Sequence, residues 1–330
     1  MSDKPKLAIC WFGGCGGCDE AIVDLNENIL KVTDAFDLVL WPVALDFKYH
    51  HIEAMKDGEI TLSIINGSVR NSEHEELAHL LRKKSQFVLA FGACACFGGT
   101  PGMANIRSKE DIFQWVYEDA PTIVNPKRNV PKTATKMDGK ELTLPDFYKQ
   151  VFPLNRIIDV DYYLPGCPPP PDLIYNAVSA AIAGNLPPKG ATLAPRRALC
   201  DVCERNKTKP ERLQIQKFHR IHEIQADPEK CFLAQGIICT GPATRSGCGE
   251  VCMKTNIPCR GCFGPVEGVA DMGAKYLSAL ASLIEANTEE ERKILTESIV
   301  DPTGYFYRFT TASSLLQKKR ETSKKRDEVR

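Results

Sequence analysis

The chain has 330 residues, with 42 Lys and Arg against 42 Asp and Glu, so its formal net charge is zero. This balance argues against a nucleic-acid-binding protein and against binding to an anionic membrane surface. No apolar run approaches the roughly 18 residues that a membrane span needs, and no signal core or twin arginine precedes the first apolar segment, so we expect a cytoplasmic protein. The unusual feature is the 14 cysteines. A reducing cytosol does not keep disulfides, so clustered cysteines there indicate metal ligands first.

The first half of the chain alternates segments typical of strands with segments typical of helices. Runs rich in Val, Ile, Leu and aromatic residues predict strands over Leu7–Phe12, Phe36–Pro42, Ile60–Ile65, Phe87–Phe91 and Arg156–Leu164. Helical spacing of apolar residues, or a proline at the start and a glycine after the end, predicts helices over Asp19–Val32, Glu73–Lys84 and Pro171–Ala183. Such alternation favours an α/β domain with a parallel sheet covered on both faces. We expect a flavodoxin-like strand order.

Two changes in composition interrupt this pattern. Residues 120–151 are polar and carry four prolines, which predicts an insertion or long loop that is either solvated or in contact with a partner. From about residue 186 the chain has little periodicity and many cysteines, until helical patterns return over Glu267–Asn287 and Glu289–Val300. The tail Gln317–Arg330 is nearly all charged, and we expect it to fray. These features predict a flavodoxin-like domain over residues 1–185 and an irregular, cysteine-rich domain with C-terminal helices over residues 186–330.

Four cysteines of the first domain follow predicted strands directly. Cys15 and Cys18 lie in GGCGGC after the first strand, Cys94 follows Phe87–Phe91, and Cys167 follows the last strand in PGCPPPP. Ligands of open α/β sheets bind at the carboxyl ends of the strands, so we expect these cysteines to meet at that edge. Glycines permit a tight backbone there, and helix N-termini direct N–H groups toward thiolates. Four thiolates from three loops suit a 4Fe–4S cluster.

Zinc is the alternative, because it also takes four cysteines and a CxxC pair alone does not distinguish the two. Zinc sites usually staple small domains, whereas this domain has enough chain for its own core, which favours iron and sulfur. The second domain carries eight further cysteines, enough for two more sets of four: Cys200, Cys203, Cys231, Cys239, Cys248, Cys252, Cys259 and Cys262. Metal–ligand bonds would there replace part of the missing apolar core. The sequence therefore predicts an iron–sulfur domain over residues 186–330.

The remaining candidates for chemistry are weak. Cys10, inside the first strand, and Cys96, two residues after Cys94, are expected to be small buried thiols, although Cys96 is an alternative ligand to Cys94. No histidine falls in a metal-binding pattern; we expect the first four to be solvated and the last two to lie on the surface or approach the cysteine-rich region: His50, His51, His74, His79, His219 and His222. No nucleotide-binding loop, Ser–His–Asp set or carboxylate pair is present. We predict a chain that conducts electrons and has no catalytic residue of its own.

Six segments together carry a family resemblance: CGGCDEA, FGACACFGG, PGCPPPP, CDVC, CTGPAT and PCRGC, in this order. Over about residues 5 to 265 the chain resembles the small, electron-transferring subunit of nickel–iron hydrogenases. It looks most like the cytoplasmic methyl-viologen-reducing type, which does not reduce the deazaflavin coenzyme and is coupled to heterodisulfide reductase. The related small subunit of respiratory complex I has adjacent cysteines and lacks the second-half cysteines, so GGCGGC counts against it.

The resemblance implies three 4Fe–4S clusters: a proximal one on Cys15, Cys18, Cys94 and Cys167, a medial one on Cys248, Cys252, Cys259 and Cys262, and a distal one on Cys200, Cys203, Cys231 and Cys239. Membrane-linked members have proline and a three-iron cluster where this chain has Cys252, so four irons are implied here. Many members have histidine in place of Cys200, and the Cys231–Cys239 spacing is two residues longer than usual. Those membrane-linked members also have a glutamate, assigned to proton transfer, where this chain has Gly14, so no proton route is implied.

The same resemblance implies a function and partners. A nickel–iron hydrogenase large subunit would split hydrogen, and this chain would relay the electrons from the proximal through the medial to the distal cluster. The next acceptor would be a small 2Fe–2S protein that feeds the flavin subunit of heterodisulfide reductase, in an anaerobic, methanogenic context. Two alternatives remain open: the same relay for a different anaerobic oxidoreductase partner, and a zinc-stapled interaction module without a redox role.

Overall fold

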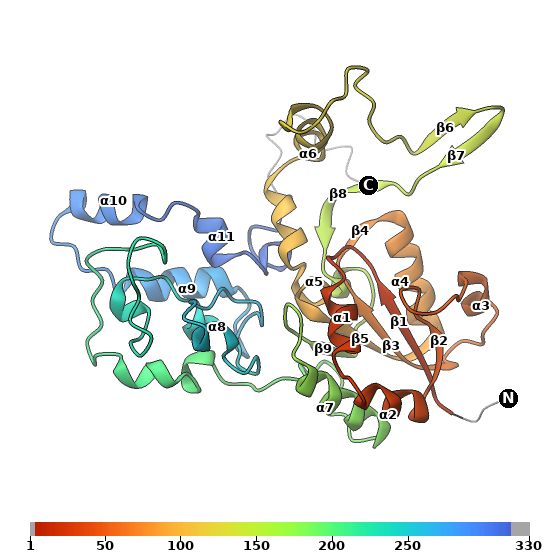
Figure 1. Ribbon diagram of the computed structural model, residues 1–330, viewed down its shortest axis with the longest axis horizontal. Helices are drawn as coiled ribbons and strands as arrows, with labels where there is room; N and C mark the ends of the chain where they lie inside the picture. The colour runs from red at the N-terminus through yellow and green to blue at the C-terminus, as the bar shows by residue number, and fades with distance from the viewer. Residues whose placement is uncertain (1–3, 318–330) are drawn as a thin grey trace.

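A computed structural model describes residues 4–317, and its centre is one parallel sheet of five strands (Figure 1). The strands are β1 (Lys6–Trp11), β2 (Asp37–Leu40), β3 (Ile60–Asn66), β5 (Ser85–Phe91) and β9 (Tyr162–Leu164). They lie in the order β2-β1-β3-β5-β9, and every neighbouring pair is parallel. Counted along the chain this is the order 2-1-3-4-5, so the predicted flavodoxin-like topology is confirmed.

Helices cover both faces of this sheet, as the alternation predicts. One face packs against α1 (Gly17–Val23), α2 (Asn28–Ala35) and α7 (Pro171–Ile182), and the other against α3 (Tyr49–Glu53), α4 (Ser72–Lys84) and α5 (Gly92–Phe97). Successive residues of β1 point to opposite faces: Leu7 and Ile9 join the first apolar cluster, whereas Ala8 and Cys10 join the second. The sheet therefore has an apolar core on each side and leaves its carboxyl edge free for loops.

Two predicted elements differ from the structure. Asp19–Val32 is not one helix, because Asn26 has φ +51° and the left-handed turn around it separates α1 from α2. The last strand begins only at Tyr162: a 3-10 turn, η3 (Leu154–Arg156), ends at the first residue of the predicted strand, and residues 157–161 are not in a strand. Asp161 explains this start, since its carboxylate accepts the Val88 N–H at 2.8 Å and so takes the donor that a longer strand would have used.

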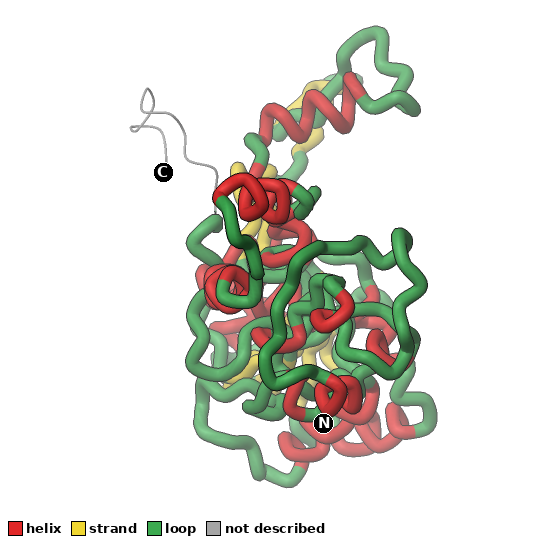
Figure 2. The backbone as a smooth tube through the Cα atoms, turned by 90° about the vertical axis from the view of Figure 1, so that its left-hand side faces the viewer, coloured by secondary structure: helices red, strands yellow, loops and turns green. Residues whose placement is uncertain are grey.

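Residues 120–151, predicted to be an insertion or long loop, contain regular secondary structure. Strands β6 (Ala134–Met137) and β7 (Lys140–Thr143) form an antiparallel hairpin, whose turn at Asp138 and Gly139 has φ of +52° and +76°. Strand β8 (Phe147–Phe152) then pairs antiparallel with β4 (Val69–Asn71). The helix α6 (Lys109–Gln114) and the one-turn π-helix η2 (Trp115–Asp119) precede the hairpin. Figures 1 and 2 show this whole segment projecting from the sheet.

Up to residue 317, the second half is built from short turns and four helices around two apolar clusters of its own. Its helices are α8 (Val251–Lys254), α9 (Met272–Ala281), α10 (Glu289–Glu297) and α11 (Pro302–Phe306), and its 3-10 turns are η4 (Leu199–Asp201), η5 (Glu204–Thr208), η6 (Leu233–Gln235), η7 (Gly241–Ala243) and η8 (Thr311–Ser313). The last turn returns to the first half, where the Thr311 hydroxyl donates to Met103 Sδ of η1 (Thr100–Ile106) at 3.3 Å. Among residues 4–317, no helix is long and apolar enough to cross a bilayer. The tail expected to fray lies, from residue 318 on, outside the described residues.

Candidate metal centres

Four cysteines gather at the carboxyl edge of the sheet, from three loops. Cys15 lies in the turn after β1 and Cys18 in the first turn of α1, where Gly16 takes the left-handed φ of +86° that the turn requires. Cys94 lies in α5, directly after β5, and Cys167 follows β9. Parallel pairing brings the ends of these strands to one side. Cys15 and Cys167 are exposed, whereas Cys18 and Cys94 are half-buried, so the group opens toward the surface.

The four thiols share one electrostatic environment. Burial raises the pKa of Cys18, and the nearby Cys94, Cys167, Cys96 and Cys15 thiols raise it further. Burial likewise raises the pKa of Cys94 to about 12, with Cys167 and Cys15 adding to it. Each thiolate would repel the others in a poorly solvated place. A cationic metal centre would take up this negative charge.

Glycines give two of these sulfur atoms their space. A Cβ on Gly92, which has φ +82°, would lie 2.3 Å from Cys18 Sγ and 3.6 Å from the Gly166 carbonyl oxygen. A Cβ on Gly99, with φ +56°, would lie 2.5 Å from Cys94 Sγ. Glycine is thus required here both for backbone conformation and for close approach to sulfur. The glycines of the segment FGACACFGG therefore leave space for two cysteine sulfur atoms, a glycine cradle, in addition to the cysteines that the segment carries.

The first set of the second half is drawn from three separate turns. Burial raises the pKa of Cys200 to about 12, and Cys231 is the next cause, ahead of Cys203. A Cβ on Gly241 would lie 3.3 Å from Cys200 Sγ and 3.7 Å from Cys239 Sγ, so these two sulfur atoms share one glycine cradle. The longer spacing between Cys231 and Cys239 is taken up by the turn η6 (Leu233–Gln235).

The second set of this half, Cys248, Cys252, Cys259 and Cys262, has electrostatic neighbours in both of the other sets. Burial raises the pKa of Cys262, and then Cys259, Cys248, Cys167 and Cys252 contribute in that order. Cys167 belongs to the sheet-edge set, so the two groups are electrostatic neighbours. On the other side, Cys259 raises the pKa of Cys239 after burial itself. Cys262 is therefore within electrostatic reach of the sheet-edge set, and Cys259 is within reach of Cys239.

Several other predicted residues can be placed. Cys10 and Cys96 are 2% and 3% exposed, which confirms their predicted burial, and the Cys96 thiol donates to the Ala90 carbonyl at 3.3 Å.

His50, His51 and His79 are exposed as expected. His74 is not: it is half-buried and stacks on Phe12 with ring centroids 5.2 Å apart. His222 is exposed, and His219, which is half-buried, lines a cavity of about 560 Å³ beside Ile238. Among residues 4–317, no group of three or more His, Cys, Asp or Glu side chains is placed so that it could hold a single metal ion.

One buried polar group near the sheet-edge set has no counterpart in the sequence analysis. Asp19, directly after Cys18, is 3% exposed, and its carboxylate accepts the Trp41 indole N–H and the Asn66 amide N–H, both at 2.9 Å. Asn66 also donates to the Cys10 carbonyl at 3.2 Å. These bonds tie the start of α1, and with it Cys18, to the ends of β2 and β3. An acidic residue at the start of a helix carries no signal of such burial.

Comparison with known proteins agrees with this arrangement of fold and cysteines. The family model described as "NADH ubiquinone oxidoreductase, 20 Kd subunit" matches residues 15–181, half of the chain and a range that includes all four sheet-edge cysteines. The chain is therefore an oxidoreductase subunit of this class.

Relatives along the whole chain identify the branch of the class. The iron–sulfur subunit of the F420-non-reducing hydrogenase of Archaeoglobus profundus is 40% identical over 95% of this chain and 98% of its own length. The corresponding F420-non-reducing hydrogenase subunit of Methanothermobacter thermautotrophicus is 36% identical over 97% of this chain and 98% of its own length. The chain belongs to this family of F420-non-reducing hydrogenase small subunits, which confirms the predicted resemblance. Among solved structures, a NAD+-reducing [NiFe]-hydrogenase in the H2-reduced state aligns over 56% of this chain and 94% of that chain, with 29% identity and a TM-score of 0.48.

Proposed function

We propose that this chain is the electron-transferring subunit of a nickel–iron hydrogenase and that it carries electrons through three 4Fe–4S clusters. The proximal cluster would be bound by the sheet-edge set within the domain of residues 1–185, and the medial and distal clusters within the domain of residues 186–330. The ligands are Cys15, Cys18, Cys94 and Cys167 (proximal), Cys248, Cys252, Cys259 and Cys262 (medial), and Cys200, Cys203, Cys231 and Cys239 (distal).

The observation that supports this proposal is that medial cysteines have electrostatic neighbours in both of the other sets. Cys262 of the medial set interacts with Cys167 of the proximal set, and Cys259 of the medial set interacts with Cys239 and Cys200 of the distal set. No proximal cysteine is among the causes of the raised pKa of Cys200 or Cys239. An electron relay needs one metal group between the group where electrons enter and the group where they leave. Three independent structural metal sites do not need such an order.

The chemistry of the thiols fits iron–sulfur clusters. Each group combines partly buried cysteines whose thiolates would repel one another, and cluster iron is a cationic centre that thiolates prefer. Glycine cradles at Gly92, Gly99 and Gly241 leave room beside the sulfur atoms. When bound, the clusters supply one-electron redox chemistry. The chain itself holds them, fixes their succession and surrounds the medial and distal sets with apolar side chains.

The partners follow from this role. Electrons would enter the proximal cluster from the hydrogenase large subunit, where hydrogen is split, because the exposed Cys15 and Cys167 lie at the surface of that set. They would leave the distal cluster for a small 2Fe–2S protein and the flavin subunit of heterodisulfide reductase, in the cytoplasm. The same relay serving a different anaerobic oxidoreductase is the second candidate, since the cysteine order supports any partner that donates at the proximal end.

Metal analysis of the native complex tests the proposal. The complex would be purified without oxygen through a tag on this chain, and iron, nickel, zinc and acid-labile sulfide would be measured. Three clusters predict about 12 irons and as many sulfides on this chain, with nickel from the co-purifying large subunit. Iron and sulfide without nickel would move the relay to another partner enzyme. Zinc without sulfide would end the redox proposal in favour of the zinc-stapled module.

A further inference from the structure

Arg205 is a buried cation between two cysteine-bearing segments of the second half. It lies in η5 (Glu204–Thr208), two residues after Cys203, and is only 7% exposed. Its guanidinium reaches away from its own turn and stacks on the ring of Phe232, 4.3 Å from the ring centroid. Phe232 follows Cys231 directly, so the stack joins the turns that carry two distal cysteines.

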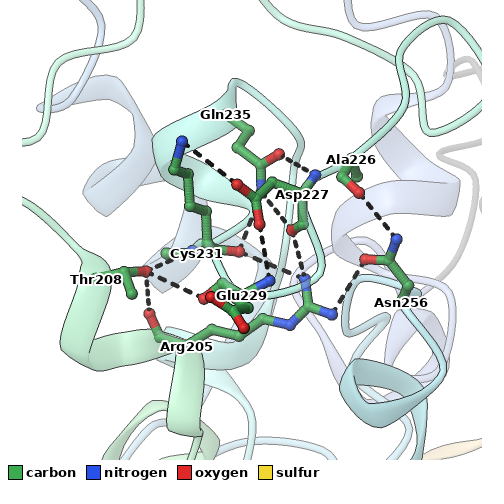
Figure 3. Close-up of polar contacts among 9 residues, drawn as sticks. Arg205, Thr208, Ala226, Asp227, Glu229, Cys231, Gln235 and Asn256 are labelled. Carbon is green, nitrogen blue, oxygen red and sulfur yellow. Dashed lines mark hydrogen bonds and ion pairs between the residues drawn. The ribbon is translucent and has the colours of Figure 1, made fainter.

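The guanidinium binds two further segments through both of its terminal nitrogens (Figure 3). Nη1 donates to the carbonyl oxygens of Asp227 at 3.2 Å and Lys230 at 3.4 Å, in the loop that leads to Cys231. Nη2 donates to the Met253 carbonyl at 2.8 Å and to Asn256 Oδ1 at 3.1 Å. Met253 follows the medial cysteine Cys252 in α8. One side chain therefore joins the distal cysteine loop to the medial cysteine helix.

Every acceptor of this guanidinium is neutral. Three are backbone carbonyls and the fourth is the side-chain oxygen of Asn256, whose Nδ2 is itself fixed to the Ala226 carbonyl at 3.0 Å. Within the part of the chain that the structure describes, Arg205 forms no ion pair. A guanidinium stays charged inside proteins, and a buried charge without a counter-charge is costly. Its contacts Phe232 and Met253 directly follow Cys231 and Cys252, so the ionised thiols of these two sets would supply the compensating negative charge.

We propose that Arg205 is a positioning residue that fixes the medial and distal cysteine sets relative to each other and supplies a fixed positive charge to both clusters. The inference rests on the proposed function, because it requires the clusters to be present. Reduction adds one negative charge to a cluster, and a nearby buried cation stabilises that charge. The charge of Arg205 therefore raises both reduction potentials, which keeps the exit side of the relay able to accept electrons.

Two variants separate the charge of Arg205 from its contacts. Arg205→Met removes both the charge and the four hydrogen bonds. Asn256→Asp keeps the Arg205 side chain, gives up the Nδ2 hydrogen bond to the Ala226 carbonyl, and places a carboxylate 3.1 Å from Nη2, which neutralises the charge. Lys207→Met is the matched control, because this cation belongs to the same turn but its side chain is 75% exposed and pairs with Glu204. Each variant would be made in the full complex, and the medial and distal clusters titrated by EPR at controlled potential, with iron and sulfide determined alongside.

At the wild-type midpoint, we expect the reduced-to-oxidised ratio of the medial and distal clusters to fall at least tenfold in Asn256→Asp, which is 59 mV for a one-electron couple. Arg205→Met should show the same fall in this ratio, or should lose medial or distal iron because the hydrogen bonds between the two cysteine-bearing segments are gone. Lys207→Met should match the wild type. Full iron with unchanged potentials in Arg205→Met or Asn256→Asp would overturn the proposal, as would iron loss from Asn256→Asp or an equal shift in Lys207→Met. Failure of the proposed function would appear differently, as a wild-type complex without iron and sulfide.

Discussion

Replacement of Gly92 by alanine tests whether the glycine cradle at Cys18 is needed for the proximal cluster. The φ of +82° at Gly92 costs an alanine about 1–2 kcal/mol. The new Cβ would also lie 2.3 Å from Cys18 Sγ, roughly 1 Å inside an ordinary van der Waals contact. The sulfur atom must therefore move away from its position. We expect Gly92→Ala to lose the proximal cluster, about 4 of about 12 irons, in anaerobic iron and sulfide analysis.

Gly58→Ala is the matched control for this prediction. Gly58 has a similar φ of +73°, but nothing lies within 4 Å of its Cβ position, and it precedes β3 at the opposite edge of the sheet. It should show the same backbone strain of about 1–2 kcal/mol in an unfolding titration and keep all its iron. If Gly92→Ala retains full iron and sulfide and is destabilised only as much as Gly58→Ala, the cradle has no role in holding a cluster.

Three further predictions concern single residues. Cys94→Ala should remove the proximal cluster, whereas Cys96→Ala should be nearly silent because its thiol is buried and bonded to a carbonyl; lowered iron in Cys96→Ala would reverse this ligand choice. Cys252→Pro lies in the first turn of α8, where proline is tolerated, so the protein should fold with a three-iron medial cluster, and an unchanged EPR spectrum of the oxidised protein would contradict this. Burial lowers the pKa of His74 from 6.5 to about 4. Because the unfolded chain binds the proton first, stability should fall as pH drops from 6.5 toward 4; His74→Phe should lose this part of the pH dependence in urea titrations at pH 7 and 5, and an identical slope in both proteins would refute it.

The sheet could be predicted because its signals are local. Each central strand is a short apolar run between turn residues, and α4 and α7 have the caps and apolar spacing expected of helices. The alternation does not itself fix the strand order; the expected flavodoxin-like order is nevertheless correct. The cysteine positions after the strands were predictable for the same reason, since the carboxyl ends of parallel strands share one edge.

The differences come from interactions that the local pattern does not show. Apolar spacing continues through Asn26, but a single left-handed residue there ends one helix and starts another. The start of β9 depends on the Asp161 carboxylate, which takes a hydrogen bond from the distant Val88. The hairpin of β6 and β7 did have a local signal: Asp138–Gly139 between alternating residues is typical of a two-residue hairpin turn. The prolines around it gave the opposite impression of an irregular loop.

The buried polar groups could not be predicted from the sequence for a different reason. Asp19 and Arg205 are charged residue types that are seldom buried, and each is held by partners at least 22 positions away in the sequence. Nothing in CDEA or CERN shows that these side chains turn inward. Their significance emerges only where the fold brings the cysteine-bearing segments together.

The second half shows how cysteine ligands and an apolar core combine. The sequence predicts metal bonds in place of a missing core, yet two apolar clusters are present, and the cysteines pack within them: Cys231 and Cys239 against one, and Cys203, Cys248 and Cys259 in or against the other. An apolar shell excludes water from a cluster and sets its potential. Residues such as Tyr276, whose hydroxyl donates to the Cys239 carbonyl at 2.8 Å, join packing to ligand geometry. The core and the thiols thus depend on each other, so a mutation in either should disturb both folding and electron transfer.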